Sequence, residues 1–307
     1  MTKVLIATDK PFAPIAVKGI REVIEEAGFE LGLLEGYTTK EELLKAVADA
    51  DAVIIRSDKA DKDVIDAAVK LKIIVRAGAG YDNVDLQAAS EKGMVVMNTP
   101  GQNSNAVAEL AFGMMAYYAR NFFNGKSGTE LKGKSLGIHA YGWVGKNVAR
   151  IAKGFGMVVY AFDPFISKEV IENDGVICVG TVEELYKNCQ YISLHIPSNT
   201  QTKGSVNYSL LSLMPGKGVL VNTARAEVVN EADLLKIFAD RDDFAYLSDV
   251  APANLADFQA AYASRIFCTP KKMGAQTEEA NVNAGIAAAK QIVAFLKHDD
   301  RTFQVNK

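Results

Sequence analysis

The amino-acid sequence predicts an α/β protein with two parallel sheets, and three observations support this prediction. Short runs rich in β-branched residues alternate with amphipathic stretches of helical periodicity, which is the order of β–α–β units in a parallel sheet. The expected strands are apolar along their whole length, as in strands that helices cover on both faces. A chain of 307 residues is also long enough for about two domains of ordinary size.

The first domain is expected to begin directly at the N-terminus. Its strands are expected at Val4–Ala7, Ala52–Ile55, Ile73–Val75 and Val95–Met97. Ile15–Glu26 and Lys40–Ala48 place apolar residues at helical spacing between the first of these strands. The segment 98–103, which reads Asn-Thr-Pro-Gly-Gln-Asn, is rich in turn-forming residues and ends this part of the chain.

A long helix, expected from Asn105 to about Asn121, opens the second domain. Five strands are expected after it, at Leu136–His139, Val158–Ala161, Tyr191–Leu194, Gly218–Asn222 and Ala245–Ser248. Helical periodicity fills Lys146–Phe155 and Glu231–Ala239, so the β–α alternation continues through this half.

The domain boundaries are expected at the two breaks in this pattern. A last long helix, from Thr277 to about Leu296, is expected to return to the first domain, with Phe303–Val305 as a final small strand. We therefore expect one domain of residues 1–103 plus 282–307 and a second of residues 104–281, with a cleft between them.

Composition and charge exclude several classes of protein. Hydrophobic residues make up 49% and charged residues 23%, which is close to the average soluble globular protein. The net charge of -3, with scattered lysines and arginines, gives no electrostatic basis for nucleic acid or membrane as a partner. The longest apolar stretch, 107–119, contains Glu109 and is shorter than the ~20 residues that span a bilayer. The first residues lack a secretory leader pattern, so we expect a soluble cytoplasmic protein.

The cysteines and histidines indicate no metal site. Cys178, Cys189 and Cys268 show no C-x-x-C spacing, and the chain has only three histidines. A sparse and odd number of thiols suits a reducing compartment, so we expect these cysteines to be buried thiols.

A dinucleotide-binding fingerprint follows the strand Leu136–His139. The segment 140–145 reads Ala-Tyr-Gly-Trp-Val-Gly, which is G-x-G-x-x-G with alanine in the first position. Gly142 allows the backbone to approach a pyrophosphate, and Gly145 permits close packing of helix on strand. The helix N-terminus supplies backbone N–H donors for the phosphates. Ala140 must either avoid a positive φ or carry strain there.

The acidic residue expected after such a fingerprint is Asp163, 18 positions beyond Gly145 (163 − 145). A carboxylate at this place accepts hydrogen bonds from ribose hydroxyls and repels a 2′-phosphate, which favours NAD over NADP. The alternative is a glycine-bearing β–α turn followed by a surface aspartate. The support from Asp163 favours a Rossmann-like NAD domain.

Two further segments carry groups suited to an acidic substrate. Arg225 follows a predicted strand end, where open α/β sheets bind their ligands. An arginine there can hold a carboxylate through two hydrogen bonds and polarise a carbonyl group, although it could instead form a surface salt bridge. Lys271 and Lys272 lie in a tight loop just before the last helix.

The segment 76–85, Arg-Ala-Gly-Ala-Gly-Tyr-Asp-Asn-Val-Asp, resembles the signature of the D-isomer-specific 2-hydroxyacid dehydrogenases. Further motifs of this family follow in its order, at Asn98–Pro100, Asn103 with Val107–Glu109, the fingerprint, Leu194–Pro197, Asn222–Arg225, Thr269–Pro270 and Gly274–Ala280. The resemblance covers nearly the whole chain. Within the family, the sequence is similar to phosphoglycerate dehydrogenases that lack C-terminal regulatory domains.

The resemblance implies a fold and a reaction. The fold would consist of a flavodoxin-like substrate domain and a Rossmann NAD domain. The reaction would be NAD-dependent oxidation of D-3-phosphoglycerate to 3-phosphohydroxypyruvate, as in serine biosynthesis. The apolar residues of the long helix after Asn105 also imply a homodimer, because this region forms the dimer contact in the family. They are Val107, Leu110, Phe112, Met114, Met115, Tyr117 and Tyr118.

The resemblance also implies roles for individual residues. Arg225 would bind and polarise the substrate, and the backbone of 78–80 (Gly78, Ala79, Gly80) would hold its carboxylate. Asn103 would line the cleft, and Arg56 with Ser57 would hold the substrate phosphate. The residues expected to border NAD are Ala79, Tyr141, Gly142, Trp143, Val144, Gly145, Asp163, His195, Ile196, Pro197, Thr223, Ala224, Asp249 and Gly274.

The sequence departs from the family at the general acid/base. The family has a histidine oriented by a glutamate, whereas alignment on Gly274 places Lys272 and Asn254 at these positions. An unperturbed lysine titrates near ~10.4, and a neighbouring carboxylate would raise this pKa further, whereas burial or a nearby Arg225 would lower it. Loss of the glutamate is therefore consistent with a lysine in this role. Lys271 is the alternative in the same loop, and the three histidines, His139, His195 and His298, are the others.

Two other functions remain open at this stage. One is a dehydrogenase for an unphosphorylated acid such as glycerate (or its oxidised form, hydroxypyruvate) or D-lactate. The other is a non-catalytic protein that senses NADH, since some relatives of this fold act as transcriptional corepressors.

Overall fold

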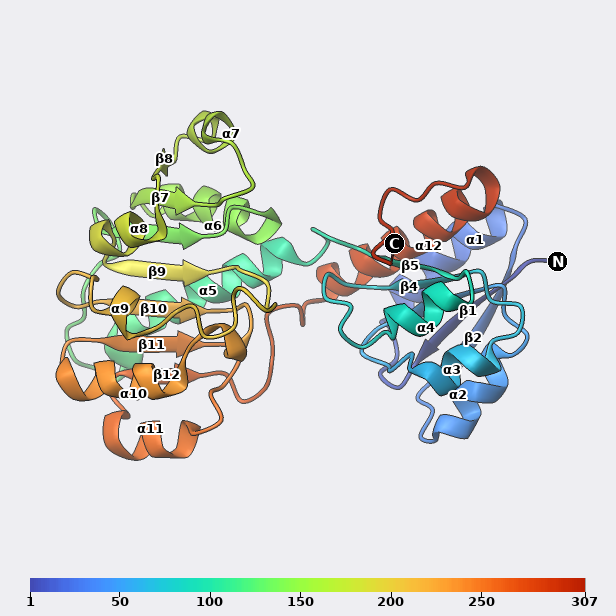
Figure 1. Ribbon diagram of the computed structural model, residues 1–307, viewed down its shortest axis with the longest axis horizontal. Helices are drawn as coiled ribbons and strands as arrows, with labels where there is room; N and C mark the ends of the chain where they lie inside the picture. The colour runs from blue at the N-terminus through green and yellow to red at the C-terminus, as the bar shows by residue number, and fades with distance from the viewer. Residues whose placement is uncertain (307) are drawn as a thin grey trace. The chain divides into compact units, whose positions relative to one another are not determined.

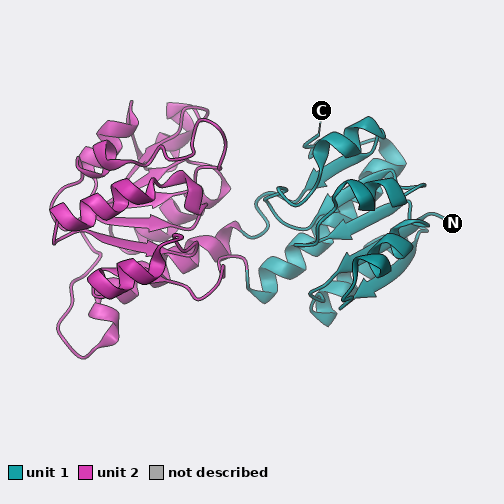
Figure 2. Ribbon diagram, turned by 60° about the horizontal axis from the view of Figure 1, so that its bottom comes forward, with its two compact units in different colours: residues 1–103, 276–307 teal, residues 104–275 magenta. Residues whose placement is uncertain are grey.

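The computed structural model describes residues 1–306 and divides the chain into two compact units (Figure 1; Figure 2). Unit 1 contains residues 1–103 and the chain from residue 276 onward, and unit 2 contains residues 104–275. The predicted α/β class with two parallel sheets is confirmed. The second boundary lies at residue 276 instead of 282, because Thr277 caps the last helix and thus belongs to the same unit as that helix.

Unit 1 is built on a five-stranded parallel sheet in the order β2-β1-β3-β4-β5, the flavodoxin-like arrangement of a doubly wound fold. Its strands are β1 (Lys3–Thr8), β2 (Glu30–Glu35), β3 (Ala52–Ile55), β4 (Ile73–Arg76) and β5 (Val95–Asn98). Its helices are α1 (Pro14–Glu26), α2 (Lys40–Val47), α3 (Lys62–Ala67), α4 (Leu86–Glu91) and α12 (Glu278–His298).

Helices cover both faces of this sheet, which explains the uninterrupted apolar strands. One face packs against α1 and α12, which lie side by side in Figure 1, and α2, α3 and α4 lie on the other face. Alternate residues of one strand therefore enter two different cores. In β1, Ile6 faces α1 and α12, whereas Leu5 belongs to the opposite core.

Unit 2 contains a seven-stranded parallel sheet in the order β12-β11-β10-β9-β6-β7-β8, the Rossmann arrangement with one additional edge strand. Its strands are β6 (Ser135–His139), β7 (Val158–Phe162), β8 (Ile177–Cys178), β9 (Tyr191–Leu194), β10 (Val219–Asn222), β11 (Ala245–Ser248) and β12 (Ile266–Cys268). Its helices are α5 (Ser104–Ala119), α6 (Trp143–Gly154), α7 (Lys168–Asn173), α8 (Val182–Asn188), α9 (Tyr208–Leu211), α10 (Glu231–Asp240) and α11 (Leu255–Tyr262), with short 3-10 turns η1 (Asn121–Phe123) and η2 (Ala226–Val228).

The expected apolar helix is α5, and most of its apolar side chains are used inside unit 2. Phe112, Met114 and Met115 are almost fully buried in the core that α5 shares with α6. Leu110 and Tyr118 are partly buried against the same core. The apolar character of this helix is therefore largely explained by packing within the unit.

Four strand assignments differ from those expected. β2, β8 and β12 are missing from the sequence-based assignment, and all three are edge strands of the two sheets. The expected strand Phe303–Val305 is wrong, because this segment forms only one isolated antiparallel bridge, between Gln304 and Met97. Among residues 1–306, no helix combines the length and the apolar character needed to cross a membrane.

Candidate functional site

The register of the unit 2 sheet aligns the carboxyl ends of its central strands at one edge. His139 pairs with both Phe162 and Leu194. Asn222 pairs with Leu194 and with Ser248, which in turn pairs with Cys268. The residues that follow these ends are Ala140, Asp163, His195, Thr223, Asp249 and Thr269. Most of the predicted site residues in unit 2 therefore lie at or just beyond one edge, where open α/β sheets bind ligands.

The fingerprint turn joins β6 to α6 and is strained at its first residue. Ala140 has a φ of +83°, in the region that glycine usually occupies. Gly142 is the N-cap of α6, and a Cβ added to it would meet no atom within 4 Å. At Gly145, by contrast, a Cβ would lie 2.4 Å from the carbonyl oxygen of Ala140. Glycine at 145 thus allows the helix to pack on the turn, and Gly142 leaves room for a phosphate.

Asp163 follows β7 and is bonded to this turn. Its Oδ2 accepts a hydrogen bond from the backbone N–H of Tyr141 (2.7 Å), and its Oδ1 accepts one from the backbone N–H of Phe165 (2.8 Å). A carboxylate offers about four lone-pair sites, so each oxygen can still accept a ribose hydroxyl. The carboxylate is therefore able to fix the turn and to bind a sugar at the same time.

The three residues 141, 143 and 144 of the fingerprint differ in exposure. The side chain of Tyr141 is fully buried, and its hydroxyl donates to Asp174 Oδ2 (3.0 Å), so only its backbone faces the turn. Trp143 is 64% exposed at the start of α6. Val144 packs partly against the unit 2 core.

Two histidines lie near the carboxyl ends of β6 and β9: His139 is buried and His195 is half-buried. His139 Nδ1 lies 3.2 Å from the hydroxyl of Tyr186, and His195 Nε2 lies 2.9 Å from Ser193 Oγ. Burial lowers the pKa of His139 to about 4, and burial together with the neighbouring His139 lowers the pKa of His195 to about 3. Both imidazoles are therefore neutral near pH 7, which argues against His195 as a proton donor. Ile196 is buried and Pro197 is exposed in the segment that follows.

A cavity of about 490 Å³ opens beside His139 and Phe162. Its other walls come from the start of α8 and from the segment 205–213 that contains α9. Because His139 and Phe162 end adjacent strands, this cavity lies at the same carboxyl edge as the fingerprint turn.

The segment after β10 is held by Asn222. Its amide Nδ2 donates to the carbonyl oxygen of Arg225 (2.9 Å), and its Oδ1 accepts from the backbone N–H of Ala224 (2.9 Å). The hydroxyl of Thr223 is buried and has no hydrogen-bond partner among the described residues. An unpaired buried hydroxyl is unfavourable, so the Thr223 hydroxyl is suited to hydrogen-bond a ligand bound at this edge.

Asp249 holds the loop that carries the two lysines. This carboxylate is only 2% exposed. Its Oδ1 accepts hydrogen bonds from Thr269 Oγ1 and from the backbone N–H of Met273 (both 2.7 Å), and its Oδ2 accepts from the backbone N–H of Gly274 (2.8 Å). The loop is thereby tied at both ends, with Lys271 and Lys272 exposed at its tip. Asn254, at the position of the family's glutamate, is the N-cap of α11.

In unit 1, the loop 78–80 follows β4 and is held by β5. The carbonyl oxygen of Gly78 accepts from the backbone N–H of Thr99 (2.9 Å), and that of Ala79 accepts from Asn98 Nδ2 (2.6 Å). Gly78 has a φ of +152°, and a Cβ there would lie 1.5 Å from Nη1 of Arg76. The guanidinium of Arg76 therefore lies directly on this loop, and the sequence had given Arg76 no role. The Thr99 hydroxyl is buried and has no partner within residues 1–306.

Arg56 follows β3 and is engaged by the protein itself. Its Nη1 donates to the carbonyl oxygens of Lys10 (3.0 Å) and Pro11 (3.2 Å), and its Nη2 donates to Asn281 Oδ1. The guanidinium also lies over the ring of Phe12, 4.9 Å from its centroid. Two of its five donors, on Nε and Nη2, remain for a ligand.

The surroundings of Arg56 are acidic. Asp58, Asp9 and Glu35 each raise the pKa of the guanidinium, although burial lowers it more strongly. Ser57 is exposed beside it, and Asn103 lies in the turn before α5. A phosphate at Arg56 would meet both the positive guanidinium and these carboxylates.

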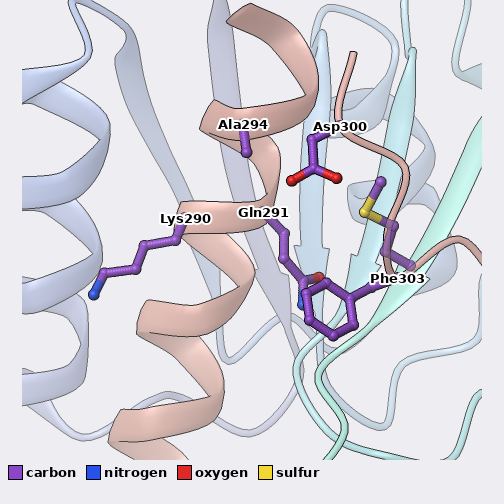
Figure 3. Close-up of a pocket in the computed structure, with 6 residues that line it drawn as sticks. Lys290, Gln291, Ala294, Asp300 and Phe303 are labelled. Carbon is purple, nitrogen blue, oxygen red and sulfur yellow. The ribbon is translucent and has the colours of Figure 1, made fainter. Parts of the chain in front are cut away.

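A second cavity, of about 190 Å³, lies in unit 1 between β5, α12 and the segment after α12 (Figure 3). Its walls are Met97, Lys290, Gln291, Ala294, Asp300 and Phe303. None of the predicted site residues lines it, so we do not include it in the candidate site.

Comparison with known proteins gives the family. A family model described as "D-isomer specific 2-hydroxyacid dehydrogenase, catalytic domain" matches residues 7–306. The chain belongs to this family. A solved structure of NAD+-bound 3-phosphoglycerate dehydrogenase from Entamoeba histolytica shares 49% identity with a TM-score of 0.90, and the match covers 100% of this chain and 99% of that one.

Two curated relatives differ in name and in length. D-3-phosphoglycerate dehydrogenase of Methanocaldococcus jannaschii is 38% identical over 312 residues, which cover 97% of this chain and 58% of the relative. Hydroxypyruvate reductase of Thermotoga maritima is 34% identical over 281 residues, which cover 86% of this chain and 90% of the relative. The chain thus spans little more than half the length of the first relative.

The low pKa values of His139 and His195 predict a loss of stability in acid. In the unfolded chain the pKa of each histidine is ~6.5. In the folded chain the pKa is about 4 for His139 and about 3 for His195. Below pH 6.5 the unfolded state therefore binds protons that the folded state does not, and the free energy of unfolding decreases as the pH falls. We expect each histidine to account for about 2 kcal/mol of this decrease between pH 7 and 4.5. Urea unfolding of the wild type and of His139→Gln/His195→Gln at both pH values measures it; equal decreases in the two proteins would contradict the expectation.

Proposed function

We propose that this chain is an NAD-dependent dehydrogenase that oxidises D-3-phosphoglycerate to 3-phosphohydroxypyruvate. The observation that carries the proposal is the carboxyl edge of unit 2, where the fingerprint turn, Asp163, Thr223 and the lysine loop follow β6, β7, β10 and β12. The likeness over the whole chain to the Entamoeba histolytica enzyme, whose structure holds NAD+, supports the cofactor and the substrate.

The residues at this edge fit a dinucleotide. Gly142 and the N-terminus of α6 would bind the pyrophosphate, and Asp163 would bind the adenosine ribose. The cavity beside His139 and Phe162 would accept the adenine. The unpaired hydroxyl of Thr223 would gain a partner from the bound cofactor. NAD+ supplies the acceptor for a hydride from the substrate's C2.

The chain's own residues would move the proton and bind the acid. In oxidation, the neutral amine of Lys272 accepts the proton of the C2 hydroxyl as hydride leaves the same carbon. Arg225 binds the carboxylate and polarises the forming carbonyl group. In the reverse direction, the ammonium of Lys272 returns the proton to the carbonyl oxygen.

Asp249 would act on this chemistry through the lysine loop. Both of its oxygens are occupied by the loop's own donors, at Thr269, Met273 and Gly274. We therefore assign its carboxylate to fixing the position of Lys272. A histidine–glutamate pair is replaced here by a lysine on a loop that a buried aspartate holds.

A second candidate is the reduction of hydroxypyruvate, which lacks the phosphate. Two observations favour it. The Thermotoga maritima relative, named a hydroxypyruvate reductase, is covered over 90% of its length. In addition, most donors of Arg56 are bonded within unit 1 and carboxylates surround it, so the expected phosphate site is only partly available.

The first experiment compares these substrates directly. The initial rate of NADH consumption is measured by its absorbance with 3-phosphohydroxypyruvate and, separately, with hydroxypyruvate. Saturable consumption with the phosphorylated compound alone is expected. Preference for hydroxypyruvate would support the second candidate. NADH binding without turnover of either compound, or of other 2-keto acids, would indicate a sensing protein.

Replacement of Lys272 tests the acid/base assignment. Lys272→Ala is expected to lower kcat by about 10²–10⁴-fold, because proton transfer to the carbonyl oxygen loses its donor. The Kd for NADH is expected to change little. Lys271→Ala is the matched control, since it removes the neighbouring charge from the same exposed loop. Wild-type rates in Lys272→Ala, with a loss in Lys271→Ala, would transfer the role to Lys271.

Replacement of Arg56 tests phosphate recognition. Arg56→Ala is expected to raise KM for 3-phosphohydroxypyruvate by about 10–100-fold, since a hydrogen bond to a charged group contributes about 1.5–3 kcal/mol, and to leave KM for hydroxypyruvate nearly unchanged. An equal increase for both substrates would show that Arg56 only supports the fold of unit 1, as its bonds to Lys10 and Pro11 also allow.

We also propose a homodimer, formed through the aromatic residues that follow α5. Phe123 is 71% exposed, and its ring packs on Tyr117, which contacts Phe122 and Phe267. Light scattering is expected to give twice the chain mass for the wild type and a lower mass at dilution for Phe123→Ala. A monomer mass for the wild type at high concentration would contradict this proposal.

A further inference from the structure

We propose that Ala140 and Asp163 act as one coupled pair, in which the carboxylate that binds the ribose also holds the strained turn that receives the pyrophosphate. This inference rests on the proposed NAD function and concerns how the chain selects its cofactor. It predicts that the effect of a substitution at Asp163 on cofactor binding depends on which residue is present at position 140.

The strain is located at one residue. Ala140 has a φ of +83°, at the position where the fingerprint usually has glycine. A non-glycine residue in this region is strained and persists only where its surroundings enforce the conformation. Substitution by glycine would remove most of this strain.

Three contacts enforce the conformation of the turn. The backbone N–H of Ala140 donates to the carbonyl oxygen of Phe162 (2.9 Å), which fixes one side of the residue. Its carbonyl oxygen lies against the backbone of Gly145, 2.4 Å from where a Cβ would stand. The next N–H, that of Tyr141, donates to Asp163 Oδ2 (2.7 Å).

Of these three contacts, the one with Asp163 is the only one made by a side chain, and it is charged. A hydrogen bond to an ionised acceptor is roughly twice as strong as one between neutral groups. Asp163 is itself fixed, because its Oδ1 accepts from the backbone N–H of Phe165 (2.8 Å). An asparagine at 163 could accept from only one of these two N–H groups and would present its own N–H₂ to the other.

The coupling has a consequence for cofactor choice. Loss of the Asp163 carboxylate removes the ribose acceptor and, because Ala140 is strained, also allows the turn to relax away from the pyrophosphate position. With glycine at 140 there is little strain to release, so the same substitution should remove the ribose contact alone. A shift toward NADPH by substitution of Asp163 should therefore require Ala140→Gly as well.

A double-mutant cycle tests this coupling. The wild type, Ala140→Gly, Asp163→Asn and the double variant are titrated with NADH, and their thermal midpoints are measured without cofactor. We expect Asp163→Asn to weaken NADH binding about 100-fold with Ala140 present and about 10-fold with glycine there, a tenfold coupling that corresponds to about 1.4 kcal/mol. The thermal midpoint of the cofactor-free protein should instead fall less in the Ala140 background, because relaxation of the turn there releases strain that partly offsets the lost hydrogen bond.

Lys217→Gly is the matched control. Lys217 also has a positive φ, +60°, but it is exposed in the turn before β10 and makes no contact with Asp163 within the described chain. Combined with Asp163→Asn, it should show simple additivity in both measurements.

Each result decides the inference. Equal losses on Asp163→Asn in both backgrounds, within about twofold, would overturn it while leaving NAD binding intact. If the wild type binds no NADH, the proposed function fails, and the cofactor-free thermal midpoints still test the coupling. If Asp163→Asn does not fold, the same cycle is measured with Asp163→Ser, and unequal or equal losses of NADH binding in the two backgrounds support or overturn the coupling in the same way.

Discussion

The aligned carboxyl ends of the parallel strands are the constraint on which the candidate site depends. In unit 2, the register ladder brings the ends of β6, β7, β9, β10, β11 and β12 to one edge. Residues as distant in the sequence as Ala140 and Thr269 therefore lie at the same edge of the sheet. Because a parallel sheet repeats one strand direction, every loop at this edge can contribute to one ligand site.

Two carboxylates fix the loops at this edge through hydrogen bonds within the protein. Asp163 accepts backbone N–H groups from two separate loops, and Asp249 accepts three donors from the lysine loop. A half-buried or buried carboxylate is stable only when such donors satisfy it. The same hydrogen bonds that compensate these charges also fix the fingerprint turn and the lysine loop.

Unit 1 presents a different balance of charge. Arg76 lies on the loop 78–80, whereas Arg56 is bonded to main-chain carbonyls and to α12 and is surrounded by acidic residues. A phosphorylated substrate would therefore have to compete with bonds that already hold the Arg56 guanidinium. This balance is the structural basis for keeping both the phosphorylated and the unphosphorylated acid as candidates.

The sequence by itself determined the α/β class, the central strands, the fingerprint and the family resemblance, because each depends on local pattern or on residue order. It did not predict β2, β8 and β12, since edge strands are half-exposed or very short, and it wrongly predicted a strand at 303–305. Only the tertiary structure showed that Ala140 adopts a positive φ, that Asp249 holds the lysine loop, and that the donors of Arg56 are largely engaged. These features depend on hydrogen bonds between residues far apart in the chain, which no local pattern encodes.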